Sequence, residues 1–78
     1  MKEIHADKYK QLGLKIAYYR KLRGFTQEQL AESLGMSTVF IGQVEAPNMN
    51  YAVSLDTLFD VADLLGVPPY KFLDFDGN

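Results

Sequence analysis

The sequence contains no cysteine, a single histidine and no long apolar run. Without cysteine there are no disulfides and no thiolate metal sites, and no other ligands stand at metal-binding spacing, so we expect no metal and no other cofactor. No apolar stretch approaches the roughly 18 residues of a membrane helix. The opening residues MKEIHADKYK lack the apolar segment of a signal peptide, so we expect a cytoplasmic protein with no membrane partner.

Positive charge is scarce beyond the first third of the chain. Residues 1–23 hold seven Lys or Arg and two acids, a balance of +5, whereas residues 24–78 hold Lys71 and eight acids, a balance of −7. These balances sum to the net charge of −2, and residues 26–45, TQEQLAESLGMSTVFIGQVE, contain neither Lys nor Arg. Such asymmetry points to nucleic acid or to an acidic partner-binding face, with a solvated surface of clustered charges as the alternative.

The length of 78 residues allows one domain with one small core, and 47% hydrophobic with 23% charged residues is ordinary globular composition. No segment alternates with a period of two, so we expect no sheet. Helix starts are predicted at the caps Thr26 (with Gln29 as a capping box), Ser37 and Ser54. Helix ends are predicted at Gly24, Gly35, Pro47 and Gly66. Pro68 and Pro69 can start only one more short helical turn, Tyr70–Leu73.

Apolar residues at helical spacing predict the buried face of each helix. The residues expected to point inward are Leu12, Ile16, Tyr19, Leu22 or Arg23, Leu30, Ala31, Leu34, Ile41, Val44, Leu55, Leu58, Val61, Ala62, Leu65, Phe72 and Leu73. We therefore expect an all-α, compact five-helix bundle. Residues 1–11 would lead into the first helix, residues 12–73 would form the domain, and residues 74–78 would be a tail.

Several segments share one register with a known family. LGLKIAYYRKLRGFTQEQLAESLGMS, then Ile41, Val44 and Glu45, then SLDTLFDVADLLGV and YKFL, resemble the phage-repressor (Cro/Xre-type) helix-turn-helix family. The resemblance covers residues 12–73 and implies a lambda-repressor-like DNA-binding domain whose third helix enters the major groove. It also implies a transcriptional regulator, commonly a homodimer on paired half-sites. Because the domain nearly fills the chain, we expect a small stand-alone bacterial regulator that represses or modulates transcription.

The third helix carries most of the candidate DNA contacts. With Ile41 and Val44 facing the core, its outer side presents Ser37, Thr38, Val39, Gly42, Gln43 and Ala46. A helical glycine costs roughly 1 kcal/mol relative to alanine, so Gly42 is interpreted as a site of close approach by a DNA phosphate or a partner's side chain, with a merely tolerated glycine as the alternative.

Phosphate contacts are expected beside this helix. The family's glutamine at the Gln27 position touches the DNA backbone, and the loop before the fourth helix carries Asn48 and Asn50. Helix N-termini also bind phosphates through free N–H groups. The resemblance further implies an ion pair between Arg20 and Glu45, which would fix the angle between the first and third helices.

Other residues carry weaker hypotheses. His5, Asp74 and Asp76 do not form a catalytic arrangement, so we expect no enzyme. The aromatics Tyr70, Phe72 and Phe75 exceed what one short turn can bury, so part of this group is a candidate dimer interface, with local core closure as the alternative. A protein-interaction module that keeps the fold without strong DNA binding is the rival function, favoured by the acidic second part of the chain and by the lack of Lys and Arg on the third helix.

Overall fold

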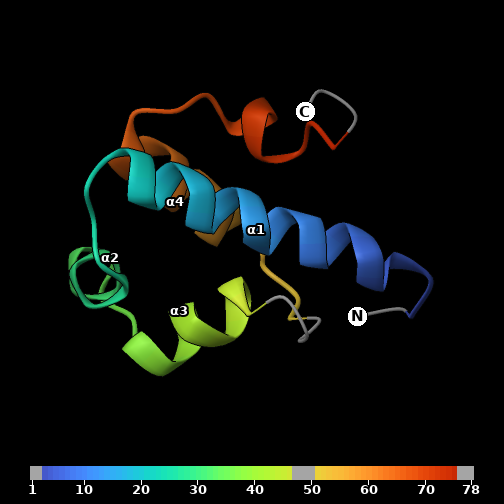
Figure 1. Ribbon diagram of the computed structural model, residues 1–78, viewed down its shortest axis with the longest axis horizontal. Coiled ribbons are helices and arrows are strands. Elements are labelled where there is room, and N and C mark those ends of the chain that lie inside the picture. Colours follow the sequence, from blue (N-terminus) through green and yellow to red (C-terminus); the bar gives the residue numbers. More distant parts are fainter. Residues whose placement is uncertain (1–2, 47–50, 76–78) are drawn as a thin grey trace.

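The computed structural model describes residues 3–46 and 51–75, and this part of the chain folds entirely into helices and connecting turns (Figure 1). Its elements are η1 (Glu3–His5), α1 (Ala6–Leu22), α2 (Gln27–Leu34), α3 (Thr38–Glu45), α4 (Leu55–Leu65) and η2 (Pro69–Phe72). The predicted all-α class is confirmed, whereas the fifth helix is not. In its place η2 forms a single 3-10 turn, in which the N–H of Lys71 donates to the carbonyl of Pro68.

The long helix α1 runs through the middle of the molecule (Figure 1). It packs against α3, α4 and η2, while α2 packs against α3 and α4. The α2 and α3 helices therefore lie together on one side of α1, with α4 and η2 covering another side. This arrangement leaves one face of α1 without a neighbouring element among the described residues.

The caps and glycine stops predicted from the sequence are confirmed. In α2, Thr26 Oγ1 accepts from Gln29 N at 3.0 Å and Gln29 Oε1 accepts from Thr26 N at 2.9 Å, which completes the capping box. Ser37 and Ser54 accept from backbone N–H groups three residues on, each at 3.1 Å. The left-handed stops, at φ of 81°, 68° and 67°, are Gly24, Gly35 and Gly66.

The first helix begins earlier than predicted. It starts at Ala6 and not at Leu12, so most of the expected N-terminal extension is helix. Asp7 lies in its first turn, where a negative charge is favourable, and Asp7 Oδ2 accepts from Gln11 Nε2 at 2.7 Å. At the other end, Pro47, expected to close α3, lies outside the described residues, and α3 ends at Glu45.

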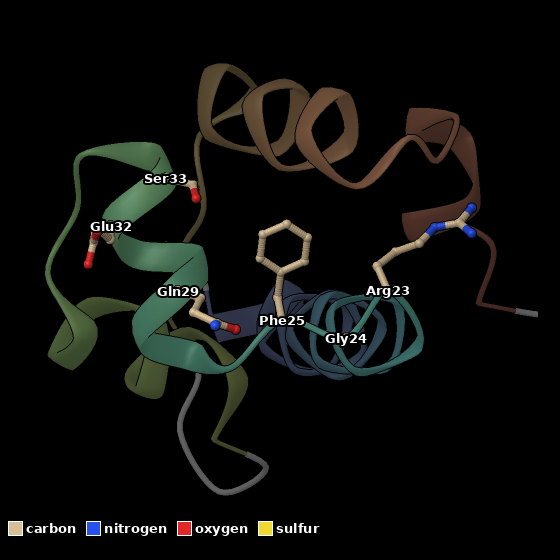
Figure 2. A pocket seen from close by; sticks show the side chains of 6 residues that line it. All are labelled: Arg23, Gly24, Phe25, Gln29, Glu32 and Ser33. Atoms are coloured by element: carbon tan, nitrogen blue, oxygen red, sulfur yellow. The ribbon is translucent and has the colours of Figure 1, made fainter.

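A hydrogen bond at the end of α1 joins it to the end of α4. Arg23 Nε donates to the carbonyl of Leu65 at 2.9 Å, in the last turn of α4, where a cation is favoured by the helix dipole. Arg23 borders a surface hollow in which the Phe25 ring stands between it and the side chains of Gln29, Glu32 and Ser33 (Figure 2). Neither Arg23 nor Leu22 belongs to the buried face of α1.

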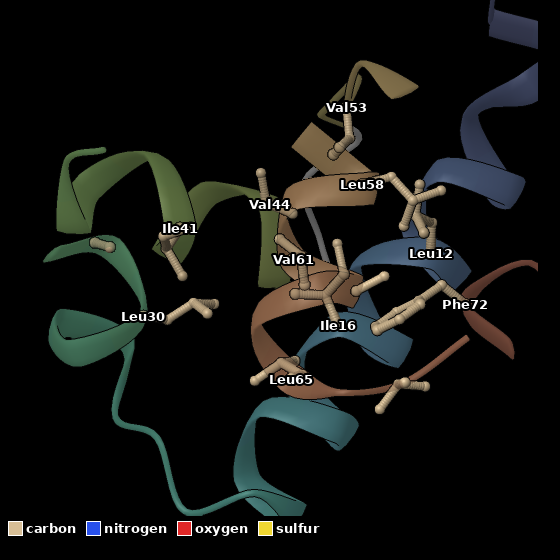
Figure 3. Close-up of a cluster of buried hydrophobic side chains, with 13 residues drawn as sticks. Leu12, Ile16, Leu30, Ile41, Val44, Val53, Leu58, Val61, Leu65 and Phe72 are labelled. Atoms are coloured by element: carbon tan, nitrogen blue, oxygen red, sulfur yellow. The ribbon is translucent and has the colours of Figure 1, made fainter. Parts of the chain in front are cut away.

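The core gathers apolar side chains from all four α-helices (Figure 3). Its members are Leu12, Ile16, Leu30, Ala31, Ile41, Val44, Val53, Leu58, Val61, Ala62, Leu65, Val67 and Phe72. Three inward predictions are wrong, because Leu55 and Leu73 are exposed and so are both members of the alternative Leu22 or Arg23. Val53, the residue before the Ser54 cap, is buried together with Leu58, the positions of a hydrophobic staple. This staple fills the space at the start of α4, and Leu55 turns outward.

The backbones of α1 and α3 approach each other closely at Gly13. Gly13 lies at the α1–α3 crossing, where a Cβ would collide with the carbonyl oxygen of Val44 and lie 3.1 Å from the carbonyl carbon. Gly42 in α3 is different, because a Cβ there would meet only Gln27 Oε1, at an ordinary 3.6 Å. The fold thus requires glycine at position 13 and not at position 42.

The two helical glycines give a matched pair of substitutions. Gly13→Ala should lower the free energy of unfolding by about 1–3 kcal/mol, because an added methyl must push two helices apart. Gly42→Ala should raise it by up to about 1 kcal/mol, since alanine favours the helix and finds room. Urea denaturation followed by circular dichroism measures both, and equal stability of the two variants would contradict the tight crossing.

Candidate nucleic-acid interface

The pair α2 and α3 forms a compact helix-turn-helix. Gly35 turns the chain after α2, and Met36 N donates to the carbonyl of Ala31 at 2.8 Å, which closes the end of α2. Ser37 then caps α3, so three residues separate the two helices. Leu30 of α2 and Ile41 of α3 are both buried in the common core, and they hold the two helices as one unit.

The outer face of α3 is neutral and partly apolar. Ser37, Thr38 and Val39 are exposed, and Val39 reaches 70% exposure although it is a valine on a helix. Gly42, Gln43 and Ala46 are half-buried. The face therefore offers two hydroxyls, two valine methyls, a bare backbone position and one carboxamide. The structure brings these predicted residues together along α3, whereas Asn48 and Asn50 lie outside the described residues.

Behind this face, Arg20 and Glu45 form a buried bidentate ion pair. Arg20 Nε lies 2.7 Å from Glu45 Oε2, and Arg20 Nη2 donates to Glu45 Oε1 at 2.9 Å. The two side chains are only 8% and 4% exposed. Arg20 Nη1 also donates to the carbonyl of Phe25 at 2.6 Å, so one guanidinium joins α1, the α1–α2 connection and the last residue of α3.

Gln27 belongs to the same network. Its Nε2 donates to Glu45 Oε1 at 3.0 Å, so Glu45 holds the carboxamide of the first residue of α2. The other end of that carboxamide, Oε1, lies next to the backbone of Gly42. Gln27 is thus fixed between the start of α2 and the middle of α3, a contact that the sequence pattern did not reveal. Its position beside Gly42 places an amide at the edge of the outer face.

The C-terminal aromatics divide into three environments. Tyr70 is 66% exposed, Phe72 is fully buried, and Phe75 is half-buried against the core. Phe72 therefore lies in the core, as its inward prediction had it, and not at the candidate interface; its ring lies edge-to-face with Tyr19 at a centroid distance of 5.1 Å. Among these three residues, Tyr70 presents the largest free surface to a partner.

Two further observations on the described residues bear on catalysis and metal binding. In the hollow of Figure 2, the Phe25 ring lies between Arg23 and the polar side chains of α2, so no acid and base face each other there. Within residues 3–46 and 51–75, no group of three His, Asp or Glu side chains could hold a metal ion. None of the helices described is long and apolar enough to span a bilayer.

Known proteins resemble this chain over most of its length. Residues 16–72 match the family profile described as helix-turn-helix. The uncharacterized HTH-type transcriptional regulator YazB of Bacillus subtilis (strain 168) is 36% identical over 65 residues, which are 76% of this chain and 91% of that protein. The profile match includes the whole of α2 and α3 and extends from the middle of α1 to the end of η2.

The buried network predicts strongly non-additive stability. Arg20→Met and Glu45→Leu should each lower the free energy of unfolding by about 3–5 kcal/mol, because each leaves a buried charge without its partner. The double variant should be about 2 kcal/mol more stable than the sum of the single effects predicts. As a control, Arg23→Met, which removes one half-exposed hydrogen bond, should cost only about 1 kcal/mol. Additive effects in urea denaturation would show that the pair is not coupled.

Proposed function

The chain belongs to the Cro/Xre-type helix-turn-helix family, and on that premise we propose that it binds specific double-stranded DNA and regulates transcription. The observation that carries this proposal is the exposed face of α3, residues 37–46, on a helix held by the Arg20–Glu45–Gln27 network. An α-helix fits the major groove of B-DNA, where each base pair presents its own donor and acceptor pattern. In this function α3 is the recognition helix.

The side chains of α3 favour a half-site that contains A·T pairs. Gln43 carries the one carboxamide on the outer face, and glutamine makes its best bidentate contact with adenine N6 and N7. The methyls of Val39 suit the methyl of thymine. With so few direct contacts, sequence-dependent DNA shape must contribute part of the specificity.

Contacts to phosphate would come from backbone N–H groups and neutral side chains. Helix α2 begins at Gln27, and helix N-termini attract anions. Because α2 and α3 carry no Lys or Arg, fewer counterions are released on binding. The affinity should therefore fall less steeply with salt than that of a basic repressor.

We propose further that the protein acts as a homodimer and represses transcription. Two recognition helices on paired half-sites double the number of base contacts, which matters for a face that offers few. Tyr70, exposed on η2, is the aromatic residue best placed to bind a second copy. A dimer that covers two half-sites would exclude other proteins from the same DNA.

A second candidate function is a protein-interaction module without strong DNA binding. The observation that favours it is Val39, an exposed apolar residue on an uncharged helix face. Such a face also suits an apolar groove on another protein. The two functions differ in whether the protein selects particular DNA sequences, so a binding selection on random duplexes distinguishes them.

The DNA contact is tested with Gln43→Ala. In a binding selection on random duplexes at 50 mM salt, the wild type should enrich an A·T-containing motif. The variant should lose about 1–3 kcal/mol on that motif and little on random DNA. Gln11→Ala, which removes the same side chain from α1, should leave the motif and the affinity unchanged. Enrichment of no motif, or the same motif with Gln43→Ala, would contradict readout by α3 and favour the protein partner.

The homodimer is tested with Tyr70→Glu. At 1 M salt, where the Debye length falls to about 3 Å and contacts between charged faces are screened, a charge on this exposed ring position should lower the mass measured by sedimentation toward that of one chain, without changing the helical signal. Phe72→Ala should instead unfold the protein at a lower denaturant concentration, since it opens a cavity in the core and costs about 3–5 kcal/mol. If the wild type remains a single chain at tens of micromolar and on DNA, the homodimer is wrong.

A further inference from the structure

The face of α1 that no other element of the described residues covers carries an apolar stripe. Leu14, Tyr18 and Leu22 follow each other at intervals of four residues and are 44%, 58% and 59% exposed. Single exposed apolar residues are common on protein surfaces, but three in one row form a continuous helical stripe. From Leu14 to Leu22 the stripe extends over nine residues, about 12 Å along the helix axis.

Lysines border this stripe on both sides. On the helical wheel Lys10 and Lys21 lie along one edge and Lys15 along the other. The acid on the same face, Asp7, accepts a hydrogen bond from Gln11 at 2.7 Å. In the part of the chain that the structure describes, the one salt bridge joins Arg20 and Glu45, so these lysines are available for other acids. We call Leu14, Tyr18, Leu22 and the three lysines the basic face.

The outer side of α4 has the opposite charge and also carries exposed apolar residues. Leu55 and Phe59, four residues apart, are 63% and 46% exposed. Beside them Asp56, Asp60 and Asp63 are exposed along the same helix, and α4 contains no Lys or Arg. From Asp56 to Asp63 the aspartates extend over eight residues, about 10 Å along the helix axis, close to the length of the stripe on α1. We call these five residues the acidic face.

We propose that the basic face of one copy binds the acidic face of a second copy. The charge complementarity of the two faces selects this occupant, because lysines meet aspartates while apolar rows meet each other. On α1, a shallow depression is lined by Gln11, Leu14, Lys15, Tyr18 and Tyr19. Tyr18 is held edge-to-face against Tyr19 at a centroid distance of 4.9 Å, which gives this depression a defined wall. Phe59 of the second copy is the side chain that fills it.

This contact joins two different faces, so it is head-to-tail and not two-fold symmetric. It is therefore separate from the dimer through Tyr70, and it does not rest on DNA binding. DNA phosphates would match the lysines of α1 but not the row of Leu14, Tyr18 and Leu22. Head-to-tail contacts can place further copies beside one already bound to DNA, which would make occupation of neighbouring sites cooperative.

The experiment measures self-association of the full chain without DNA, in a Tyr70→Glu background that removes the C-terminal contact. At 50 mM salt the sedimentation mass should rise with protein concentration above that of one chain. At 1 M salt the Debye length falls to about 3 Å, and the mass should return to that of one chain. A mass equal to one chain up to millimolar concentration at 50 mM salt would overturn the proposal.

Charge reversal then identifies the two faces. Lys15→Glu with Lys21→Glu reverses the basic face, and Asp60→Lys with Asp63→Lys reverses the acidic face. Each double variant alone should associate at least tenfold more weakly, since like charges now meet. An equimolar mixture should recover the association, because every contact between the two variants pairs opposite charges. As a control, Glu28→Lys with Glu32→Lys on α2 should change nothing, and circular dichroism checks that all variants are folded.

Two results would show that the basic and acidic faces do not bind each other, and each would overturn the proposal. If the mixture of folded variants fails to recover association, the two faces do not bind each other. If the lysine variant instead weakens DNA binding while self-association is unchanged, the basic face contacts phosphate. Failure of the DNA selection with Gln43 leaves this test unaffected, so the two proposals fail separately.

Discussion

The close approach of α1 and α3 is the constraint on which the rest of the fold depends. Because Gly13 has no side chain, the α1 backbone can come against the carbonyl of Val44. That proximity lets Arg20, two turns along α1, reach Glu45 with two hydrogen bonds. Glu45 in turn holds Gln27 at the start of α2. A chain of contacts thus leads from one glycine to the orientation of both helices of the helix-turn-helix.

A buried ion pair of this kind contributes more to geometry than to net stability. Desolvation of two charges offsets much of their attraction, and an apolar pair of similar volume is often as stable. Arg20 and Glu45 fix the orientation of α3 relative to α1, because a bidentate pair has one favourable arrangement. Every buried side-chain polar atom in the described residues has a hydrogen-bond partner. A shift of either side chain would therefore break a hydrogen bond and would satisfy no other polar group. The outer face of α3 is therefore presented from a fixed base.

Features set by neighbours in sequence could be predicted, and those set by distant segments could not. The Thr26 capping box and the Gly35 stop depend on residues within four positions, so their pattern is visible in the sequence. The need for glycine at position 13 could not be predicted from the sequence, because it comes from the carbonyl of Val44, which is thirty-one residues away along the chain. Leu55 was predicted inward by its spacing, but Val53 and Leu58 fill the core at the start of α4, and Leu55 is left exposed. Phe72 was predicted to point inward and also kept among the candidate interface residues, because the sequence does not show how many of the C-terminal aromatic rings the core can hold.

The distribution of charge suggests how a neutral helix can serve as a reader. Attraction to phosphate is independent of sequence, so lysines on α3 would raise the affinity for all DNA together. A face of hydroxyls, methyls and one carboxamide lacks that attraction, and its preference for one site depends on base edges and DNA shape. The ratio of specific to non-specific binding, and not affinity alone, decides occupancy among many competing sites. In the proposed function the basic residues of α1 and the acidic residues of α4 are then free for contacts between copies, which raise occupancy without lowering that ratio.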